Sequence, residues 1–344
     1  MASHRRPKQP SRARVTVLTA AAATAVALSA QVSAHAAPAQ PSKDEVKAQV
    51  DKLLEEQEQA AEKYNGAKEK ADQLRKQADQ LQDQVARGQE QLTELASGLA
   101  AVAGDQYRHA GIDPSMQLML SSDPDKYLDQ ASSFDQAAST QASTLKSLED
   151  QQRRLDQQKQ EAATVLAELD SSTQALNDAK NDVQSKLQEA QKLLSQLSAA
   201  DRASILRGGG SASRGADRID LSSLPKAAGY AGVAVQNALN KRGSAYVWGA
   251  TGPSTFDCSG LMVWAYAQAG VSLPRTSQSQ ATVGTNVGTD WHNAQPGDLV
   301  VYYGDRHHVG MYIGNGQVVH APRTGDVVKI MAADTLPIST IRRV

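Results

Sequence analysis

Cys258 is the only cysteine in the 344-residue chain, and its neighbours make it a candidate nucleophile. It lies in Phe256-Asp257-Cys258-Ser259-Gly260, and apolar residues at helical spacing follow it directly. We therefore expect Cys258 on the first turn of a buried helix, where the positive end of the helix dipole favours the reactive thiolate. Asp257 and Ser259 have the short polar side chains that cap such a turn. Because a lone cysteine is more often a small buried apolar residue, this prediction requires a base nearby.

Two histidines downstream, His308 and His320, are candidates for that base and for the group that orients it. Each stands in a short segment rich in β-branched and aromatic residues, which is typical of a strand. Gly314-Asn315-Gly316 between the two segments is a strong hairpin signal. His307 is adjacent to His308 and is the alternative base.

The register of this hairpin decides whether the two histidines meet. With a three-residue loop and Ile313 paired to Gln317, His320 lies opposite Gly310, and His308 projects from the same face of the sheet. Gly310 has no side chain, which leaves room for one ring to reach the other. The sequence therefore predicts a nucleophile, a base and an orienting group in the chain order Cys258, His308, His320.

Together with other short motifs, these residues resemble the NlpC-type cell-wall cysteine peptidases, whose catalytic domain is papain-like. The resemblance covers about residues 226–344, and Ala250 departs from it, because many members have a second glycine after the Trp-Gly pair. The pattern favours His308 over His307 as the base, because Val309-Gly310 follows it. The matching segments are Tyr246-Val247-Trp248-Gly249, Phe256 to Leu261, Leu273-Pro274-Arg275-Thr276-Ser277-Gln278, Pro296-Gly297-Asp298-Leu299-Val300, His308 to Gly314, and Val319-His320-Ala321-Pro322.

The resemblance implies a secreted peptidoglycan hydrolase that cuts stem peptides, most characteristically between γ-D-glutamate and the diamino acid. Arg275 either pairs with a substrate carboxylate or supports its own loop, and Trp248 lines the groove or packs in the core. No cofactor is implied, and no metal is expected, because the two histidines lack a third ligand at suitable spacing. By resemblance the catalytic residues are Cys258, His308 and His320, and the groove is lined by Tyr246, Trp248, Asp257, Ser259 and Ser277.

The first 36 residues are expected to be a signal peptide. A basic segment precedes an apolar run over 15–30, and Ala34-His35-Ala36 supplies a small-x-small cleavage site. Removal of its five basic residues takes the net charge from −1 to −6, which argues against a nucleic-acid partner. A single cysteine in an exported chain cannot form an internal disulfide, which favours a reactive thiol.

Residues 42–204 are predicted to form a long all-α coiled-coil hairpin with a break near 104–126. The intervening residues are mostly Glu, Lys, Gln and Asp, for which we expect a solvated outer face. The Pro and Gly residues of the break favour an antiparallel hairpin over a parallel dimer. A first heptad seam runs through Val46, Val50, Leu53, Gln57, Ala60, Tyr64, Ala67, Ala71, Leu74, Ala78, Leu81, Val85, Gly88, Leu92, Leu95, Leu99 and Val102, and a second through Leu148, Leu155, Ala162, Leu169, Leu176, Val183, Ala190 and Leu197.

A Gly- and Ser-rich segment over 205–225 is predicted to be a flexible linker before the catalytic domain at 226–344. There we expect an α+β fold, with helices near 227–241 and 259–269 packed on an antiparallel sheet. Expected strands are 298–303, 308–313, 317–321, 327–331 and 339–343.

Two alternative functions and one hypothesis on control stay open on the sequence alone. The C-terminal domain can bind wall peptides without cutting them, and the coil can serve as a scaffold at the division site. The resemblance also implies a membrane-complex or regulatory partner for the coil. A further hypothesis is that the coil covers the groove of Cys258 until a partner moves it.

Overall fold

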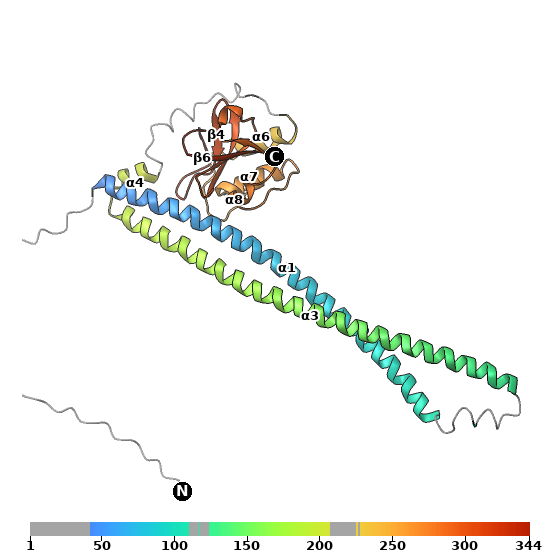
Figure 1. Ribbon diagram of the computed structural model, residues 1–344. Helices are drawn as coiled ribbons and strands as arrows, with labels where there is room; N and C mark the ends of the chain where they lie inside the picture. The colour runs from blue at the N-terminus through green and yellow to red at the C-terminus, as the bar shows by residue number, and fades with distance from the viewer. Residues whose placement is uncertain (1–41, 110–115, 117–123, 207–224, 226–227) are drawn as a thin grey trace, which may run out of the picture. The chain divides into compact units, whose positions relative to one another are not determined.

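The computed structural model describes residues 42–109, 116, 124–206, 225 and 228–344 (Figure 1). The expected signal peptide lies outside these residues, as does most of the expected linker. Among the described helices, none combines the length and the apolar composition that crossing a membrane requires.

Two long helices pack against each other and diverge where the first ends and the second begins (Figure 1). Val102, a predicted seam position near the end of the first helix, is 46% exposed. Helix α1 is Lys43–His109 and helix α3 is Pro124–Ser195. Ser42 and Glu45 form a capping box at the start of α1, where the Ser42 N–H donates to Glu45 Oε2 at 2.8 Å and the Glu45 N–H to Ser42 Oγ at 3.3 Å. A short helix, α4 (Ala199–Leu206), follows α3. The buried apolar residues shared by these helices include Val46, Val50, Ala71, Leu155, Val183, Ala190 and Ile205.

Two features of the helical region differ from expectation. Helix α1 continues through Gly104 to His109, because one glycine in a long helix costs only about 1 kcal/mol. The outer face of α1 is not solvated throughout, since Glu58, Glu62 and Asn65 are almost fully buried. These three polar side chains lie where α1 meets the C-terminal domain, so the prediction of a solvated face is wrong for them.

The C-terminal domain combines three helices with an antiparallel sheet, and the predicted α+β fold class is confirmed. The helices are α6 (Gly229–Asn240), α7 (Cys258–Ala267) and α8 (Ser277–Gln280). The strand order is β1-β6-β2-β3-β4-β5. The strands are β1 (Thr285–Gly288), β2 (Leu299–Tyr302), β3 (His308–Gly314), β4 (Gln317–His320), β5 (Lys329–Ala332) and β6 (Ile338–Arg343), and a 3-10 turn, η2, spans Trp291–Asn293.

Helix α7 is held against one face of the sheet by apolar packing. Leu261 and Met262 of α7 are buried in one cluster with Met311 and Ile313 of β3. Burial of each such side chain contributes about 1.5–3 kcal/mol. The first turn of α7 is therefore fixed close to the strand that begins with His308.

The β3–β4 hairpin has the predicted register with one local difference. Met311 pairs with Val319, and this register places His320 opposite Gly310 as expected. The expected pair of Ile313 and Gln317 is wrong, because a bulge near the turn pairs Gly314 with Gln317 instead. Asn315 and Gly316 both have positive φ, so the loop has two residues with the backbone sign of a type I′ turn.

Candidate active site

Helix α7 begins at Cys258, one residue before the predicted start at residue 259. Cys258 therefore lies on the first turn, as expected. Asp257 is its N-cap, and the Gly260 N–H donates to Asp257 Oδ1 at 2.7 Å. A Cβ at Gly260 would stand 2.1 Å from the carbonyl oxygen of Ala250, so the turn that presents the thiol requires glycine there. Cys258 is 2% exposed.

His308 and His320 meet across the hairpin, as the register predicts. His308 Nε2 lies 2.9 Å from His320 Nδ1, and the two rings are perpendicular. A Cβ at Gly310 would lie 3.1 Å from His320 Cβ, so the absence of a side chain there makes room for His320. For His308 Nδ1 to accept a proton, His308 Nε2 must carry hydrogen and donate to His320.

The thiol and the predicted base are not hydrogen-bonded to each other. Within the described residues, Cys258 Sγ contacts Glu62 Oε1 and the His307 carbonyl oxygen, both at 3.8 Å. His308 Nδ1 has no hydrogen-bond partner there, and Glu58 Oε2 lies 3.6 Å from it. Both groups that would start the reaction thus face carboxyl groups of α1.

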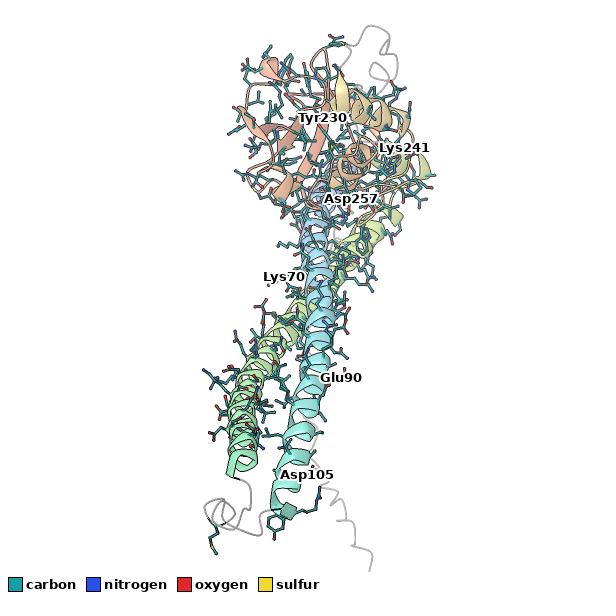
Figure 2. All side chains as sticks on the ribbon, turned by 90° about the vertical axis from the view of Figure 1, so that its right-hand side faces the viewer. Lys70, Glu90, Asp105, Tyr230, Lys241 and Asp257 are labelled. Carbon is teal, nitrogen blue, oxygen red and sulfur yellow. The ribbon has the colours of Figure 1, made fainter. Side chains whose placement is uncertain are left out.

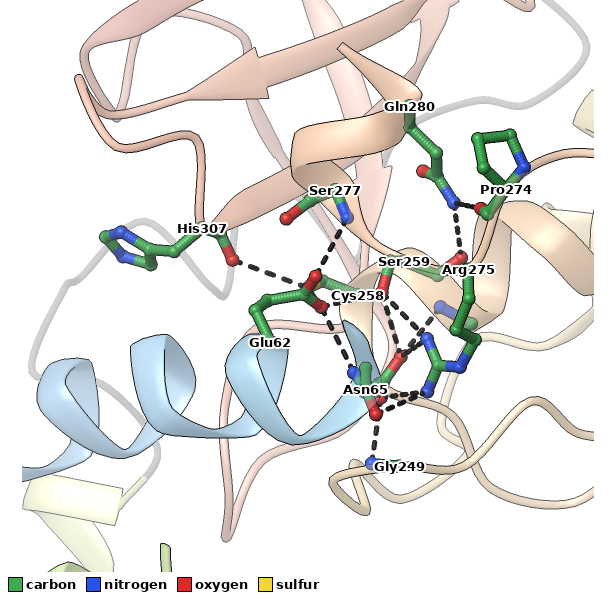
Figure 3. A network of polar contacts seen from close by, with 12 residues as sticks. Glu62, Asn65, Gly249, Cys258, Ser259, Pro274, Arg275, Ser277, Gln280 and His307 are labelled. Carbon is green, nitrogen blue, oxygen red and sulfur yellow. Dashed lines mark hydrogen bonds and ion pairs between the residues drawn. The ribbon is translucent and has the colours of Figure 1, made fainter. Parts of the chain in front are cut away.

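Asp257 and Arg275 form a bidentate ion pair beside Cys258, and Figure 3 shows Arg275 pointing toward Ser259. Arg275 Nη2 lies 2.5 Å from Asp257 Oδ2, and Nη1 lies 3.0 Å from Oδ1. The Gly249 N–H also donates to Asp257 Oδ2, at 2.8 Å. Arg275 Nη1 donates to Ser259 Oγ at 2.8 Å, which links the ion pair to the groove. Arg275 therefore holds Asp257 in place and fixes the orientation of Ser259.

Glu62 enters this network from α1 (Figure 3). Its Oε1 accepts from Ser259 Oγ at 2.7 Å and from Asn65 Nδ2 at 3.3 Å. Its Oε2 accepts from the Ser277 N–H at 2.8 Å. Asn65 also donates to Asp257 Oδ2 at 3.1 Å. The Glu62 carboxyl consequently lies in front of Cys258, with donors from three separate segments.

The other predicted residues are placed as follows. Tyr246 is buried in the domain core beside the site. Trp248 is half-buried and packs edge-on against Tyr64 of α1, with ring centroids 5.0 Å apart, so it is not core packing alone. Ser277 Oγ donates to the Arg306 carbonyl at 2.7 Å. His307 pairs with Asp305 through Nδ1, and it is His308, not His307, that pairs with His320.

Sequence reasoning missed the three α1 residues at this site, Glu58, Glu62 and Asn65. They are spaced by four and three residues and so share one face of the helix. Asn65-Gly66 is the signal that could have found them, because both residues are poor helix formers in the middle of a 67-residue helix. Gly66 lies close to the C-terminal domain, since a Cβ there would be 3.6 Å from Thr276.

Burial favours the neutral forms of Cys258 and His308 in this arrangement. It raises the pKa of Cys258 well above its usual value, and the charges of Glu62 and Asp257 add to the effect. Burial, with a smaller contribution from His307, lowers the pKa of His308 to about 3. A thiolate–imidazolium pair is thus disfavoured while α1 covers the groove.

Glu62 is poised between its two protonation states. Burial and then the charge of Asp257 raise its pKa to about 7, although the donors Ser259 and Ser277 and the charge of Arg275 act in the opposite direction. Burial also raises the pKa of Glu58, one turn away, well above its usual range. Both carboxyl groups therefore hold protons more tightly here than in water.

We expect the contact of α1 with the groove to weaken as the pH rises from about 5 to 7. Glu62 has a pKa of about 7 when buried and its usual 4.5 once exposed, so the buried state binds an additional proton in this interval and loses stability through it. The loss approaches about 3 kcal/mol, at about 1.4 kcal/mol for each pKa unit. Above pH 7 it is complete.

The measurement is the alkylation rate of Cys258 in the wild-type chain divided by that in Glu62→Gln at the same pH. Alkylation takes place when α1 has moved away, and Cys258 and Glu58 then titrate apart from Glu62, so this ratio removes the part of their titration that the two chains share. We expect the ratio to rise more than about tenfold between pH 5 and pH 8. A ratio that does not change with pH would contradict the prediction.

Within the described residues, no three His, Cys, Asp or Glu side chains are grouped so as to hold a metal ion. The geometry instead gives a lone thiol at a helix start, a hydrogen-bonded histidine pair and a buried carboxylate–guanidinium pair. The thiol and the histidine pair are of the residue types that nucleophilic acyl transfer uses, and the ion pair supports the loop beside them.

Comparison with known proteins identifies the C-terminal domain. Residues 243–340 match the model of the NlpC/P60 family. A probable endopeptidase of Corynebacterium glutamicum is 48% identical over 103 residues, which are 30% of this chain and 48% of that protein. A probable endopeptidase of Mycobacterium tuberculosis is 44% identical over 110 residues, 32% of this chain and 28% of that protein.

Among solved structures, the NlpC/p60 domain of the peptidoglycan hydrolase SagA is 30% identical, with 33% of this chain and 98% of that chain covered and a TM-score of 0.31. The chain spans about half or less of the length of the curated relatives it matches. The match of the family model agrees with the resemblance predicted from the six motifs. Residues 243–340 of this chain are an NlpC/P60 domain.

Proposed function

We propose that the chain is a peptidoglycan endopeptidase that cuts stem peptides through a Cys258-His308-His320 triad. The observation that carries this proposal is the His308–His320 hydrogen bond at 2.9 Å, which leaves His308 Nδ1 available at the end of the sheet that packs on α7. In this arrangement His308 would be the base, His320 the group that orients it, and Cys258, at the start of helix α7, the nucleophile. The NlpC/P60 match and the relatives named endopeptidases support the same reaction class.

In the proposed mechanism, His308 Nδ1 takes the proton of the Cys258 thiol once the groove is open. The thiolate attacks the carbonyl carbon of the scissile amide, and the Cys258 backbone N–H stabilises the oxyanion at the helix start. His308 then gives its proton to the leaving amine, and a thioester remains on Cys258. A water molecule, deprotonated by His308, hydrolyses the thioester and releases a carboxylate.

His320 acts as a positioning residue in this scheme. It accepts the Nε2 hydrogen of His308, which holds the ring orientation and leaves Nδ1 free for the thiol. Tyr246, Trp248, Asp257, Ser259 and Ser277 are proposed to shape the substrate groove. The scissile bond we propose is the one between γ-D-glutamate and the diamino acid.

The proposal extends to the location of the protein. A signal peptide over 1–36 would export the chain, and its place of action would be the cell wall or its surroundings. Residues 42–204 would form a coiled-coil arm for a membrane-complex or regulatory partner, joined through a linker at 205–225 to the catalytic domain at 226–344. We propose no nucleic-acid partner and no cofactor.

The test is mass spectrometry of purified muropeptides incubated with the full-length chain. Three chains are compared: wild type, Glu62→Ala, which removes the carboxyl in front of the thiol, and Glu62→Ala with Cys258→Ala. We expect fragments with a new N-terminal diamino acid in the first two samples and none in the third. Absence of fragments in all three, with unchanged wall binding, would replace the enzyme by the wall-binding or scaffold alternative.

A further inference from the structure

The Glu62 carboxyl lies next to the thiol, close to the place that a reacting acyl group must reach. Its Oε1 lies 3.8 Å from Cys258 Sγ, and both of its oxygens accept hydrogen bonds from groove residues, Ser259 and Ser277. A substrate carbonyl must come to about 3–3.5 Å from the nucleophile in order to react. Substrate and Glu62 consequently cannot occupy this position together.

The chemical identity of the group is as informative as its position. A glutamate side chain ends in a γ-carboxyl, and cleavage of a γ-glutamyl amide releases a γ-carboxyl next to the cysteine. We propose that Glu62 is an intramolecular product analogue, whose γ-carboxyl fills the acyl position that a γ-glutamyl product occupies after hydrolysis. This inference rests on the proposed function, because it takes the γ-glutamyl bond as the one that is cut.

A second glutamate of α1 completes the blockade at the base. Glu58 lies one helical turn before Glu62, and its Oε2 is 3.6 Å from His308 Nδ1. Glu58 and Glu62 are 8% and 3% exposed, so both residues are almost fully withdrawn from solvent. Helix α1 thus covers the nucleophile and the base together, and the hypothesis that the coil covers the groove acquires specific residues.

Asn65 extends the contact by one more turn and distinguishes it from accidental packing. Its side chain donates to both Glu62 and Asp257 and accepts from Arg275 Nη2 at 3.2 Å. Asp257 and Arg275 form the buried ion pair of the site, and Glu62 contacts the thiol. The α1 residues therefore satisfy the polar groups that a bound peptide would otherwise have to satisfy.

The first test measures access to Cys258, which is the only thiol in the chain, so one adduct in the intact mass reports it. Relative to wild type, Glu62→Ala and Glu62→Asp are expected to raise the rate of alkylation by iodoacetamide at least about tenfold. Aspartate keeps the charge, but its side chain is shorter by one methylene and cannot reach the same donors.

The matched control is Glu90→Ala on the same helix. Figure 2 labels Glu90 on α1, and its side chain is exposed. We expect its alkylation rate to stay within about twofold of wild type. Circular dichroism of each variant checks that α1 and α3 remain folded. Equal rates in wild type, Glu62→Ala and Glu62→Asp would overturn the proposal.

The second test asks whether an added glutamyl group replaces the missing side chain. Alanyl-D-glutamate, with a free γ-carboxyl, is expected to slow alkylation of the Glu62→Ala chain back toward the wild-type rate. Alanyl-D-alanine, which has the same terminal α-carboxyl but no γ-carboxyl, is expected to leave the rate unchanged. Equal protection by both peptides, or by neither, would overturn the assignment of a product analogue.

The alkylation tests and the muropeptide assay contradict different statements, the first the assignment of Glu62 and the second the proposed reaction. Selective protection by alanyl-D-glutamate without any release of wall fragments would contradict the proposed reaction and leave the binding assignment standing. Release of fragments at the same rate by wild type and Glu62→Ala would support the proposed reaction and contradict the assignment of Glu62, because the enzyme would be active and Glu62 would not restrain it.

Discussion

Replacement of His308 by alanine is expected to lower kcat/KM for stem-peptide hydrolysis by at least about 10³-fold, with the chain still folded. The imidazole has two tasks in the proposed mechanism, removal of the thiol proton and protonation of the leaving amine. Burial also raises the pKa of Cys258, so the thiol has little thiolate of its own to offer. The measurement is hydrolysis of a muropeptide by the variant and by its parent, in the wild-type and the Glu62→Ala backgrounds.

His307→Ala is the matched control for this prediction. The side chain of His307 pairs with Asp305 and stacks on Tyr303, with ring centroids 4.2 Å apart. We expect the His307→Ala variant to have a kcat/KM within a few fold of its parent. His320→Asn should cost less than His308→Ala, on the order of 10- to 100-fold, since asparagine can still accept a hydrogen bond from Nε2. A His308→Ala chain that retains activity within tenfold of its parent would eliminate the triad.

Arg275→Met is expected to lower the free energy of unfolding of the C-terminal domain by about 3–5 kcal/mol. The substitution leaves Asp257, which is 1% exposed, as a buried charge without its cation. The Glu62 carboxyl lies in the same network, so the negative charges would then repel each other more strongly. Urea denaturation followed by tryptophan fluorescence measures the effect, because all three tryptophans lie in this domain.

A double variant separates the charge from the packing. If the cost arises from the unpaired carboxylate, Arg275→Met with Asp257→Asn should recover part of the lost stability. Arg153→Met on α3 removes an exposed ion pair with Asp150 and should leave the unfolding of the domain unchanged. A loss that is equal in the single and the double variants would assign the effect to the packing of Arg275 alone.

The sequence was sufficient for the parts of the site that depend on local patterns. Cys258 at a helix start follows from the apolar spacing after it, and the meeting of His308 with His320 follows from the hairpin register. The bulge at Gly314 was missed because both a two-residue and a three-residue loop fit Gly314-Asn315-Gly316. A bulge near the turn absorbs this difference without a change of register at the histidines.

The contact of α1 with the groove could not be predicted in the same way. A glutamate on the outer face of a long helix has the same sequence signature whether it meets water or another domain. Glu62 and Ser259 are 197 residues apart, and no periodic pattern joins them. Gln57 illustrates the limit, because it interrupts the heptad seam yet is fully buried and accepts a hydrogen bond from Thr324 at 2.8 Å.

Glu62 and Cys258 belong to one polypeptide, and this has a consequence for how firmly the groove can be closed. Groups joined by a chain meet at an effective concentration set by the connection, on the order of millimolar for short ones. A contact of modest intrinsic affinity then suffices to keep most molecules closed at any dilution of the enzyme. A partner that draws α1 away would have to supply the free energy set by the ratio of that effective concentration to the dissociation constant of the contact.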